Sequence, residues 1–160
     1  KHLLKNNKKL IILKAFTKIY GMAGVRLGYC LCSDTELLAR MRAAGQPWAV
    51  SSLAQAAGIA ALDETEYVAK VRALIEAQRP VLADGLRALG LRVIEGRANY
   101  LLFRAPEALG EALRRKGAVL RSCGNYPGLD ASWYRTAVRT ENENRQLLAL
   151  LAETLPEVAQ

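Results

Sequence analysis

The stretch that decides the fold reads Phe16-Thr17-Lys18-Ile19-Tyr20-Gly21-Met22-Ala23-Gly24-Val25-Arg26-Leu27-Gly28-Tyr29. Apolar residues run from Leu10 to Leu13 before it, and they resume from Leu27 to Leu31. Continuous apolar runs of this length are typical of buried strands. Lys18 therefore lies at the expected end of a buried strand, where low polarity favours the neutral amine, a nucleophile toward carbonyl groups.

Arg26 follows Lys18 by eight residues, beyond the small residues Gly21, Ala23 and Gly24. Small residues allow the backbone to turn tightly and to approach a ligand closely. A guanidinium group beyond such a turn is well suited to bind a phosphate, because its planar donors match the phosphate oxygens. A lysine that reacts with a carbonyl and an arginine that binds a phosphate together suggest pyridoxal 5'-phosphate as the cofactor.

The pattern Thr-Lys-x-Tyr-Gly-x-Ala-Gly-x-Arg-x-Gly-Tyr at residues 17–29 resembles the Schiff-base lysine motif of fold-type I pyridoxal-phosphate enzymes. This is the class I and II aminotransferase family, and within it the motif is most similar to threonine-phosphate decarboxylases and histidinol-phosphate aminotransferases. The resemblance implies that Lys18 binds the cofactor as an imine and that Arg26 binds its phosphate, with Thr17 as a further candidate hydroxyl. Three residues before the lysine the family usually has serine or threonine, but this chain has Ala15, so one hydroxyl contact is absent.

Two arginines are candidate substrate ligands. Arg121 and Arg135 each lie among apolar residues of an expected strand. A guanidinium in such a setting needs an anion or hydrogen-bond acceptors, because unpaired burial is costly. The resemblance implies that Arg135 binds the substrate carboxylate or phosphate and that Arg121 assists; the alternative is a structural salt bridge. Arg139 has either a ligand role or a surface or capping role, and Asn99 a structural hydrogen bond.

Composition is that of a globular protein. The chain has 160 residues, of which 51% are hydrophobic and 24% charged. This length is sufficient for a hydrophobic core. No apolar run approaches the ~20 residues that span a bilayer, and the first residues lack a signal-peptide pattern. We therefore expect a cytoplasmic protein without a membrane segment.

The net charge of +8 is concentrated at the start of the chain. Residues 1–18 contribute +6 and contain no acid, whereas the basic and acidic residues beyond them nearly balance. A basic segment of this kind is usually a solvated surface. We therefore expect a small-molecule amino acid or amino phosphate as the binding partner and no nucleic acid, although a basic binding module remains an alternative.

The cysteines do not indicate a disulfide framework or a metal site. There are three, Cys30, Cys32 and Cys123, and the chain contains one histidine, His2. An odd number without a secretory signal argues against disulfides, and a zinc site would need a fourth ligand. We expect buried, reduced thiols and no metal.

The position of the motif predicts how the chain is organised. In the resembled family a large part of the cofactor domain precedes the lysine, so we expect a C-terminal fragment that is inactive alone. Its fold is expected to combine α/β and α+β parts. Residues 1–79 would form the tail of the large pyridoxal-phosphate-binding domain, and residues 80–160 the small C-terminal α+β domain, with the boundary near Pro80. The resemblance also implies that the complete protein is a homodimer.

Periodicity and turn residues predict the individual elements. Strands are expected over 10–16, 28–32, 91–95, 99–104, 118–122 and 133–138, and helices over 36–41, 51–62, 63–89, 106–116 and after Thr140. Pro80 should kink or divide the long helix, and Pro156 should end the last one. Thr140 and Glu143 have the spacing of a capping box. Antiparallel strands with helices on one face would form the small domain.

The resemblance suggests two reactions. The first is decarboxylation of L-threonine-O-3-phosphate, a step toward the aminopropanol linker of cobalamin. The second is transamination of histidinol phosphate or of another amino acid. The geometry of the arginine clamp decides between them, because it selects the bond to be broken. A non-catalytic folded domain is the alternative from a different class.

Overall fold

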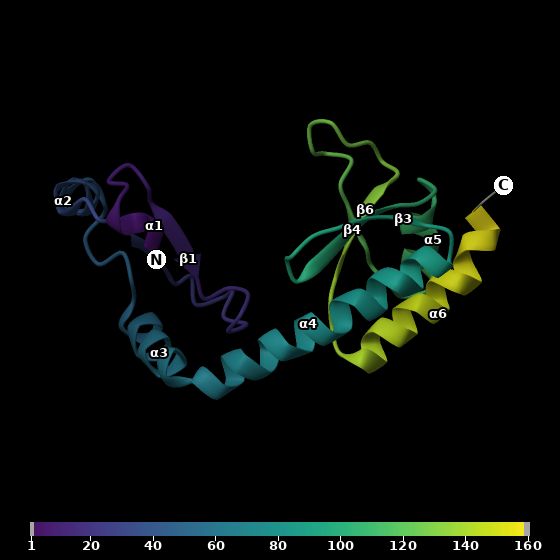
Figure 1. Cartoon of the computed structure of the whole chain (residues 1–160), viewed down its shortest axis with the longest axis horizontal. Helices are drawn as coiled ribbons and strands as arrows, with labels where there is room; N and C mark the ends of the chain where they lie inside the picture. The colour runs from purple at the N-terminus through teal and green to yellow at the C-terminus, as the bar shows by residue number, and fades with distance from the viewer. Residues whose placement is uncertain (1, 159–160) are drawn as a thin grey trace. The chain divides into compact units, whose positions relative to one another are not determined.

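A computed structural model describes residues 2–158. Tertiary contacts divide the chain into two compact units, one ending at Ala69 and the other beginning at Lys70. Helix α4 (Thr65–Ala88) carries the chain from the first unit into the second (Figure 1). This division lies ten residues before the boundary expected near Pro80, and both positions fall within α4.

The first unit is built around a β-hairpin. Its elements are α1 (His2–Lys5), β1 (Ile12–Ala15), β2 (Gly28–Leu31), α2 (Thr35–Ala44) and α3 (Ser52–Asp63). Strands β1 and β2 are antiparallel, with Ile12 opposite Leu31 and Ala15 opposite Gly28. The two predicted strands are thus confirmed, though both are shorter than expected, and residues 16–27 form the connection between them.

Strand β1 is less buried than its sequence predicts. Leu13 is 77% exposed, and Lys14 and Ala15 are exposed as well. The expectation of a buried strand is therefore wrong for the described residues. The physical reason is that β1 belongs to a sheet of only two strands, so it has one strand neighbour to cover its apolar side chains.

Helices α2 and α3 begin where the sequence predicts. The Asp34 carboxylate accepts a hydrogen bond from the Leu37 amide at 2.9 Å, and the Ser51 hydroxyl accepts one from the Ala54 amide at 3.2 Å. Both bonds satisfy amide groups that a helix start leaves free. Helix α3 also packs closely on the hairpin connection, because a side chain at Gly58 would collide with Leu27.

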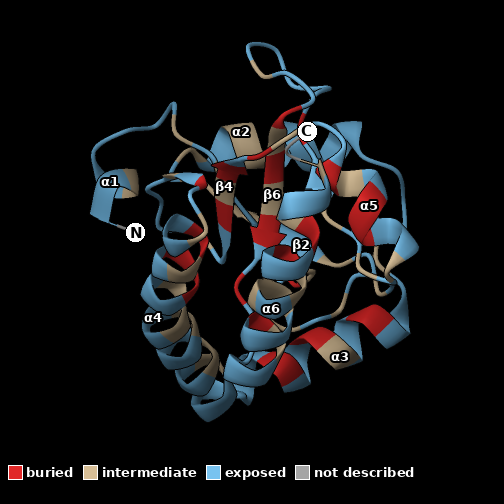
Figure 2. Cartoon of the chain, turned by 90° about the vertical axis from the view of Figure 1, so that its right-hand side faces the viewer, coloured by how far each residue is buried: buried red, intermediate tan, exposed pale blue. Residues whose placement is uncertain are grey.

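The second unit is an antiparallel sheet with helices on one face. Its strands are β3 (Arg92–Ile94), β4 (Tyr100–Arg104), β5 (Arg121–Ser122) and β6 (Trp133–Ala137), in the order β3-β4-β6-β5. The other helices are α5 (Leu109–Arg115) and α6 (Glu141–Val158). Buried residues from the sheet and from all three helices form one core: Leu82, Leu86, Leu101, Phe103, Leu109, Leu113, Tyr134 and Leu151. Figure 2 shows these buried segments of β4 and β6 together with the helices. The predicted α+β arrangement is confirmed.

Pro80 does not divide its helix, and Pro156 does not end the last one as expected. Helix α4 continues through Pro80, and α6 continues past Pro156 to Val158. A proline inside a helix removes one backbone hydrogen bond, but packing can offset this loss. Leu82 follows the first proline with no exposed surface, and Val158 follows the second and packs against the core. Within residues 2–158 no helix has both the length and the apolar character required to cross a membrane.

Candidate cofactor and substrate sites

Lys18 projects from a tight turn at one end of the hairpin. The Gly21 amide donates to the Lys18 carbonyl at 3.1 Å, and Gly21 has a φ of 65°. This left-handed conformation favours glycine. The Phe16 amide donates to the Leu27 carbonyl at 3.2 Å and closes the base of the connection. The buried setting expected for Lys18 is not found in the described residues, where the side chain is exposed.

Arg26 lies in the second turn of the same connection. Its φ of 57° is in the left-handed region that non-glycine residues rarely adopt, and such strain is found disproportionately at ligand sites. The guanidinium donates one bond, from Nη1 to the Ala23 carbonyl at 3.4 Å. Within residues 2–158 this is its one hydrogen bond, which leaves most of its five donors available to an anion.

An aromatic cluster, which the sequence analysis did not identify, supports this connection. The Phe16 ring is 4% exposed, and its centroid lies 5.1 Å from that of Tyr20 and 5.9 Å from that of Tyr29. Aromatic contacts of this kind add to the free energy of burial. The cluster joins the two ends of the connection that carries Lys18 and Arg26.

One connection carries both an amine and a guanidinium, the groups that would bind an aldehyde and a phosphate. Lys18 and Arg26 are both exposed, and they occupy the same connection between β1 and β2. Thr17, between Phe16 and Lys18, is half-buried. No hydrogen bond joins the side chains of Thr17, Lys18 and Arg26 in the described part of the chain, so all three are available to a ligand.

Arg121 and Arg135 lie opposite each other on the face of the sheet that the helices leave open. The register pairs Arg121 of β5 with Arg135 of β6, and directly opposed residues of antiparallel strands share one face. Like charges in opposed positions are destabilising. Within residues 2–158 neither guanidinium has a carboxylate within salt-bridge distance, so an anion between them would relieve the repulsion.

Tyr100 contacts Arg135 and was missed by the sequence analysis. The guanidinium carbon of Arg135 lies 4.7 Å from the centre of the Tyr100 ring, a cation–π contact. Tyr100 begins β4 and pairs with Ala137, two residues beyond Arg135 in β6. The sequence contains no signal for this contact, because it depends on the register between two strands.

Two further arginines on the open face have protein partners. Arg92 lies over the Trp133 ring at 5.7 Å. Arg104 donates to the Ser132 hydroxyl at 2.8 Å and lies 3.6 Å from an Asp130 carboxylate oxygen. The Ser132 hydroxyl, and to a smaller extent Arg104, lower the pKa of Asp130. The hydrogen bond and the ion pair distinguish Arg104 from Arg121 and Arg135, whereas Arg92, like Arg135, has an aromatic partner.

The capping box at the start of α6 is present, and Arg139 belongs to it. The Glu143 amide donates to the Thr140 hydroxyl at 3.5 Å, and the Thr140 amide donates to the Glu143 carboxylate at 3.2 Å. Arg139 pairs with Glu143 at 2.7 Å, which favours the capping role over the ligand role. The Thr140 hydroxyl and, second, Arg139 lower the pKa of Glu143. Asn99 contributes its carbonyl, which accepts from the Val138 amide at 2.9 Å.

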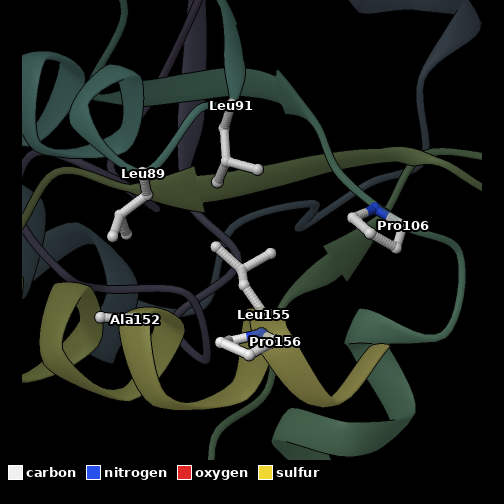
Figure 3. A pocket seen from close by; sticks show the side chains of 6 residues that line it. All are labelled: Leu89, Leu91, Pro106, Ala152, Leu155 and Pro156. Carbon is white, nitrogen blue, oxygen red and sulfur yellow. The ribbon is translucent and has the colours of Figure 1, made fainter. Parts of the chain in front are cut away.

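The pockets of the second unit differ in their polarity. One of about 440 Å³ is lined by Leu89, Leu91, Pro106, Ala152, Leu155 and Pro156, and none of these side chains is charged (Figure 3). Another, of about 610 Å³, is lined by Arg114, Val119, Leu120, Arg121, Ser122, Gly124 and Asn125. The second pocket adjoins a candidate substrate arginine and suits an anion, whereas the first has no group that could orient one.

Known proteins match almost the whole chain. Residues 1–151 match the family model described as aminotransferase class I and II. The threonine-phosphate decarboxylase of Salmonella typhimurium is 38% identical over 160 residues, covering 98% of this chain and 44% of that protein. The histidinol-phosphate aminotransferase of Symbiobacterium thermophilum is 39% identical over 158 residues, covering 97% of this chain and 43% of that protein.

Solved structures agree with this result. The histidinol-phosphate aminotransferase from Clostridium acetobutylicum superposes with a TM-score of 0.92 at 31% identity, over 98% of this chain and 48% of that one. The L-threonine-O-3-phosphate decarboxylase from Porphyromonas gingivalis superposes with a TM-score of 0.79 at 26% identity, over 98% and 49%. The histidinol-phosphate aminotransferase from Sinorhizobium meliloti, in complex with pyridoxal-5'-phosphate, is 25% identical with a TM-score of 0.73, over 94% and 41%. This chain spans less than half the length of these relatives. In sequence and in fold, the chain belongs to the class I and II aminotransferase family.

Proposed function

We propose that the whole protein is a pyridoxal-phosphate-dependent enzyme that acts on a small amino acid or amino phosphate. The observation that carries this proposal is the pairing of an exposed lysine with an incompletely bonded arginine on one connection of a family member. Lys18 supplies the amine, and Arg26 supplies the guanidinium with donors left for a phosphate. Pyridoxal 5'-phosphate is the cofactor that this pair would hold.

Each residue of the connection has a separate task. The Lys18 amine would hold the cofactor through its aldehyde and, when free, would carry a proton to or from the substrate. Arg26 binds the phosphate, and the Thr17 hydroxyl adds a hydrogen bond to it. The bound cofactor withdraws electrons from the substrate carbon whose bond is broken.

Arg135 and Arg121 hold the acidic end of the substrate. Their opposed positions on β6 and β5 allow both guanidinium groups to share one carboxylate or phosphate. A clamp of this kind orients the bond that is to break, which is the main contribution of a binding residue to rate. If the bond to the carboxylate breaks, carbon dioxide leaves and the reaction is a decarboxylation. If the bond to hydrogen breaks, a proton leaves and the reaction is a transamination.

Decarboxylation of L-threonine-O-3-phosphate is the first candidate, supported by the 38% identity to a threonine-phosphate decarboxylase. Transamination of histidinol phosphate is the second, supported by the TM-score of 0.92 to a histidinol-phosphate aminotransferase. An assay of the whole protein with threonine phosphate distinguishes them. Release of carbon dioxide without a keto acid supports decarboxylation, whereas amine transfer that requires a keto acid supports transamination.

The cofactor site is tested by covalent labelling of this chain. After addition of pyridoxal phosphate, reduction with borohydride should fix the cofactor on Lys18, as mapped by mass spectrometry. Lys14 is a matched control, since it is also exposed and lies four residues earlier in β1. K14A should retain the label and K18A should lose it. Equal labelling of Lys14 and Lys18 would refute the assignment.

We also infer a homodimer from apolar residues on the exposed side of α3. Leu53 is 84% exposed, Ile59 68% and Leu62 55%. Large apolar side chains that the chain itself leaves uncovered are typical of an interaction surface. Sedimentation velocity of the whole protein should give a dimer whose association is weakened by I59E. A monomeric wild-type protein would contradict this inference.

A further inference from the structure

Arg79 of α4 fixes the backbone just before strand β4. Its Nε donates to the Ala98 carbonyl at 3.0 Å, and its Nη2 donates to the Arg97 carbonyl at 3.1 Å. One planar guanidinium thus binds two consecutive carbonyl groups, a geometry that a flexible ammonium does not reproduce. These carbonyls lie two and three residues before Tyr100, the first residue of β4.

Gln78, the preceding residue of α4, binds Asn144 of α6, which in turn binds the segment after strand β6. The Gln78 side-chain oxygen accepts a hydrogen bond from the side-chain amide of Asn144 at 3.2 Å. Asn144 is 2% exposed, donates to the Arg139 carbonyl at 2.9 Å and accepts from the Arg139 amide at 3.0 Å. Arg139 lies two residues beyond β6, the strand that carries Arg135.

The two strand ends are also joined directly. The Val138 amide donates to the Asn99 carbonyl at 2.9 Å. Consecutive residues of one helix therefore bind the segment before the strand that presents Tyr100 directly and, through Asn144, the segment after the strand that presents Arg135. The contact between those two side chains, at 4.7 Å, lies between the two fixed ends.

We propose that Arg79 is a positioning residue for the anion site, because it holds Tyr100 beneath the Arg135 guanidinium. This role rests on the proposed function in one respect, that Arg135 binds the acidic group of the substrate. The Tyr100 ring restricts the guanidinium to one orientation, and a binding group held in advance loses less entropy when the ligand arrives. Without Arg79, the carbonyls of residues 97–98 lose both guanidinium bonds, so the backbone just before Tyr100 is no longer held in place.

The test measures the Arg135 side chain by NMR in the 160-residue chain, without ligand. A guanidinium above an aromatic ring has an Nε–H resonance shifted upfield by the ring current, and R135K assigns that resonance. Y100L defines the shift without the ring. We expect R79M to move the Arg135 resonance most of the way to the Y100L value and R79K to give an intermediate shift. R72M is the matched control, since Arg72 is an exposed arginine of the same helix and the same unit. In the R72M chain the Arg135 resonance should stay at its wild-type position.

An unchanged Arg135 resonance in a folded R79M chain overturns the proposal. If R79M loses the dispersed spectrum of a folded protein, R79K decides: an intermediate shift supports the role, and a wild-type shift overturns it. A second measurement titrates the chains with inorganic phosphate and follows the same resonance. We expect R79M to bind phosphate roughly tenfold more weakly than R72M, since misplacing a binding group has effects of this order.

The two measurements separate this inference from the proposed function. If wild-type Arg135 shows no response to phosphate, the substrate role of Arg135 fails. The ligand-free comparison of R79M with R72M then decides on its own whether Arg79 positions the side chain. If phosphate binds but equally well in both variants, the positioning role is overturned and the substrate role stands.

Discussion

Replacement of Asn144 should destabilise the second unit more than any other polar change at the start of α6. The side chain is 2% exposed and makes three hydrogen bonds: it accepts from the Arg139 amide, and it donates to the Arg139 carbonyl and to the Gln78 side-chain oxygen. N144A removes all three. At about 1 kcal/mol of net stabilisation for each bond, the free energy of unfolding should fall by about 3 kcal/mol.

N144D separates the two donated bonds from the accepted one. A carboxylate can still accept from the Arg139 amide, but it faces the Arg139 carbonyl and the Gln78 oxygen without a proton to donate. Burial and these two acceptors favour the neutral form, so the pKa of the introduced carboxyl should rise above about 3.9, its value in an unfolded chain. The Arg139 guanidinium opposes this rise, but it is already paired with Glu143 at the surface. A raised folded-state pKa makes the variant most stable below the unfolded value, and this stability is lost as pH rises through the folded pKa.

Urea unfolding followed by circular dichroism measures both effects, with N142A as the control. Asn142 is an exposed residue of the same helix, so its replacement should change the free energy of unfolding by no more than about 0.5 kcal/mol. The reasoning is refuted if N144A and N142A unfold within about 1 kcal/mol of each other. It is also refuted if N144D gains stability, relative to N144A, as pH rises from about 4 to 7.

Two further predictions concern the same unit. Hydrogen bonding to Thr140 lowers the pKa of Glu143, so the folded state gains stability above the unfolded pKa of about 4.3 and loses this gain as pH falls through the folded pKa. In thermal unfolding, the wild type should therefore lose stability more steeply in acid than E143Q. Equal slopes of stability against pH would contradict the assignment. L82A should lower the free energy of unfolding by about 2–5 kcal/mol, because the wild-type side chain has no exposed surface. V81A, at a neighbouring position that is 53% exposed, should lower the free energy of unfolding much less. If urea unfolding gave similar decreases for L82A and V81A, the core would not be built around Leu82.

Local signals in the sequence were sufficient to place most helix starts. The capping box of Thr140 and Glu143 forms as its spacing predicts, and the helix expected from residue 51 begins there, capped by the Ser51 hydroxyl. Such bonds join residues three positions apart, so both partners are visible in a short window of sequence. The same holds for the motif around Lys18 and Arg26, whose resemblance to the family is carried by a single stretch of chain.

Local signals were misleading where the outcome depends on packing against distant segments. Pro80 and Pro156 are strong local breakers, yet both helices continue, because the residues that follow them pack in a core assembled from other segments. The apolar run at β1 predicts burial, but burial depends on how many elements cover a strand. With one partner strand, Leu13 remains largely exposed.

The sequence by itself determined the family, the reactive lysine and the phosphate-binding arginine as hypotheses, because those residues lie within one continuous motif. It also identified Arg121 and Arg135 as candidates from their apolar surroundings. Only the tertiary structure decided that these two arginines are opposed across β5 and β6, that Tyr100 lies against Arg135, and that Arg79 holds the strand start. The physical reason is that strand register and helix packing join residues far apart in the chain, and no local pattern records which distant partner a side chain will meet.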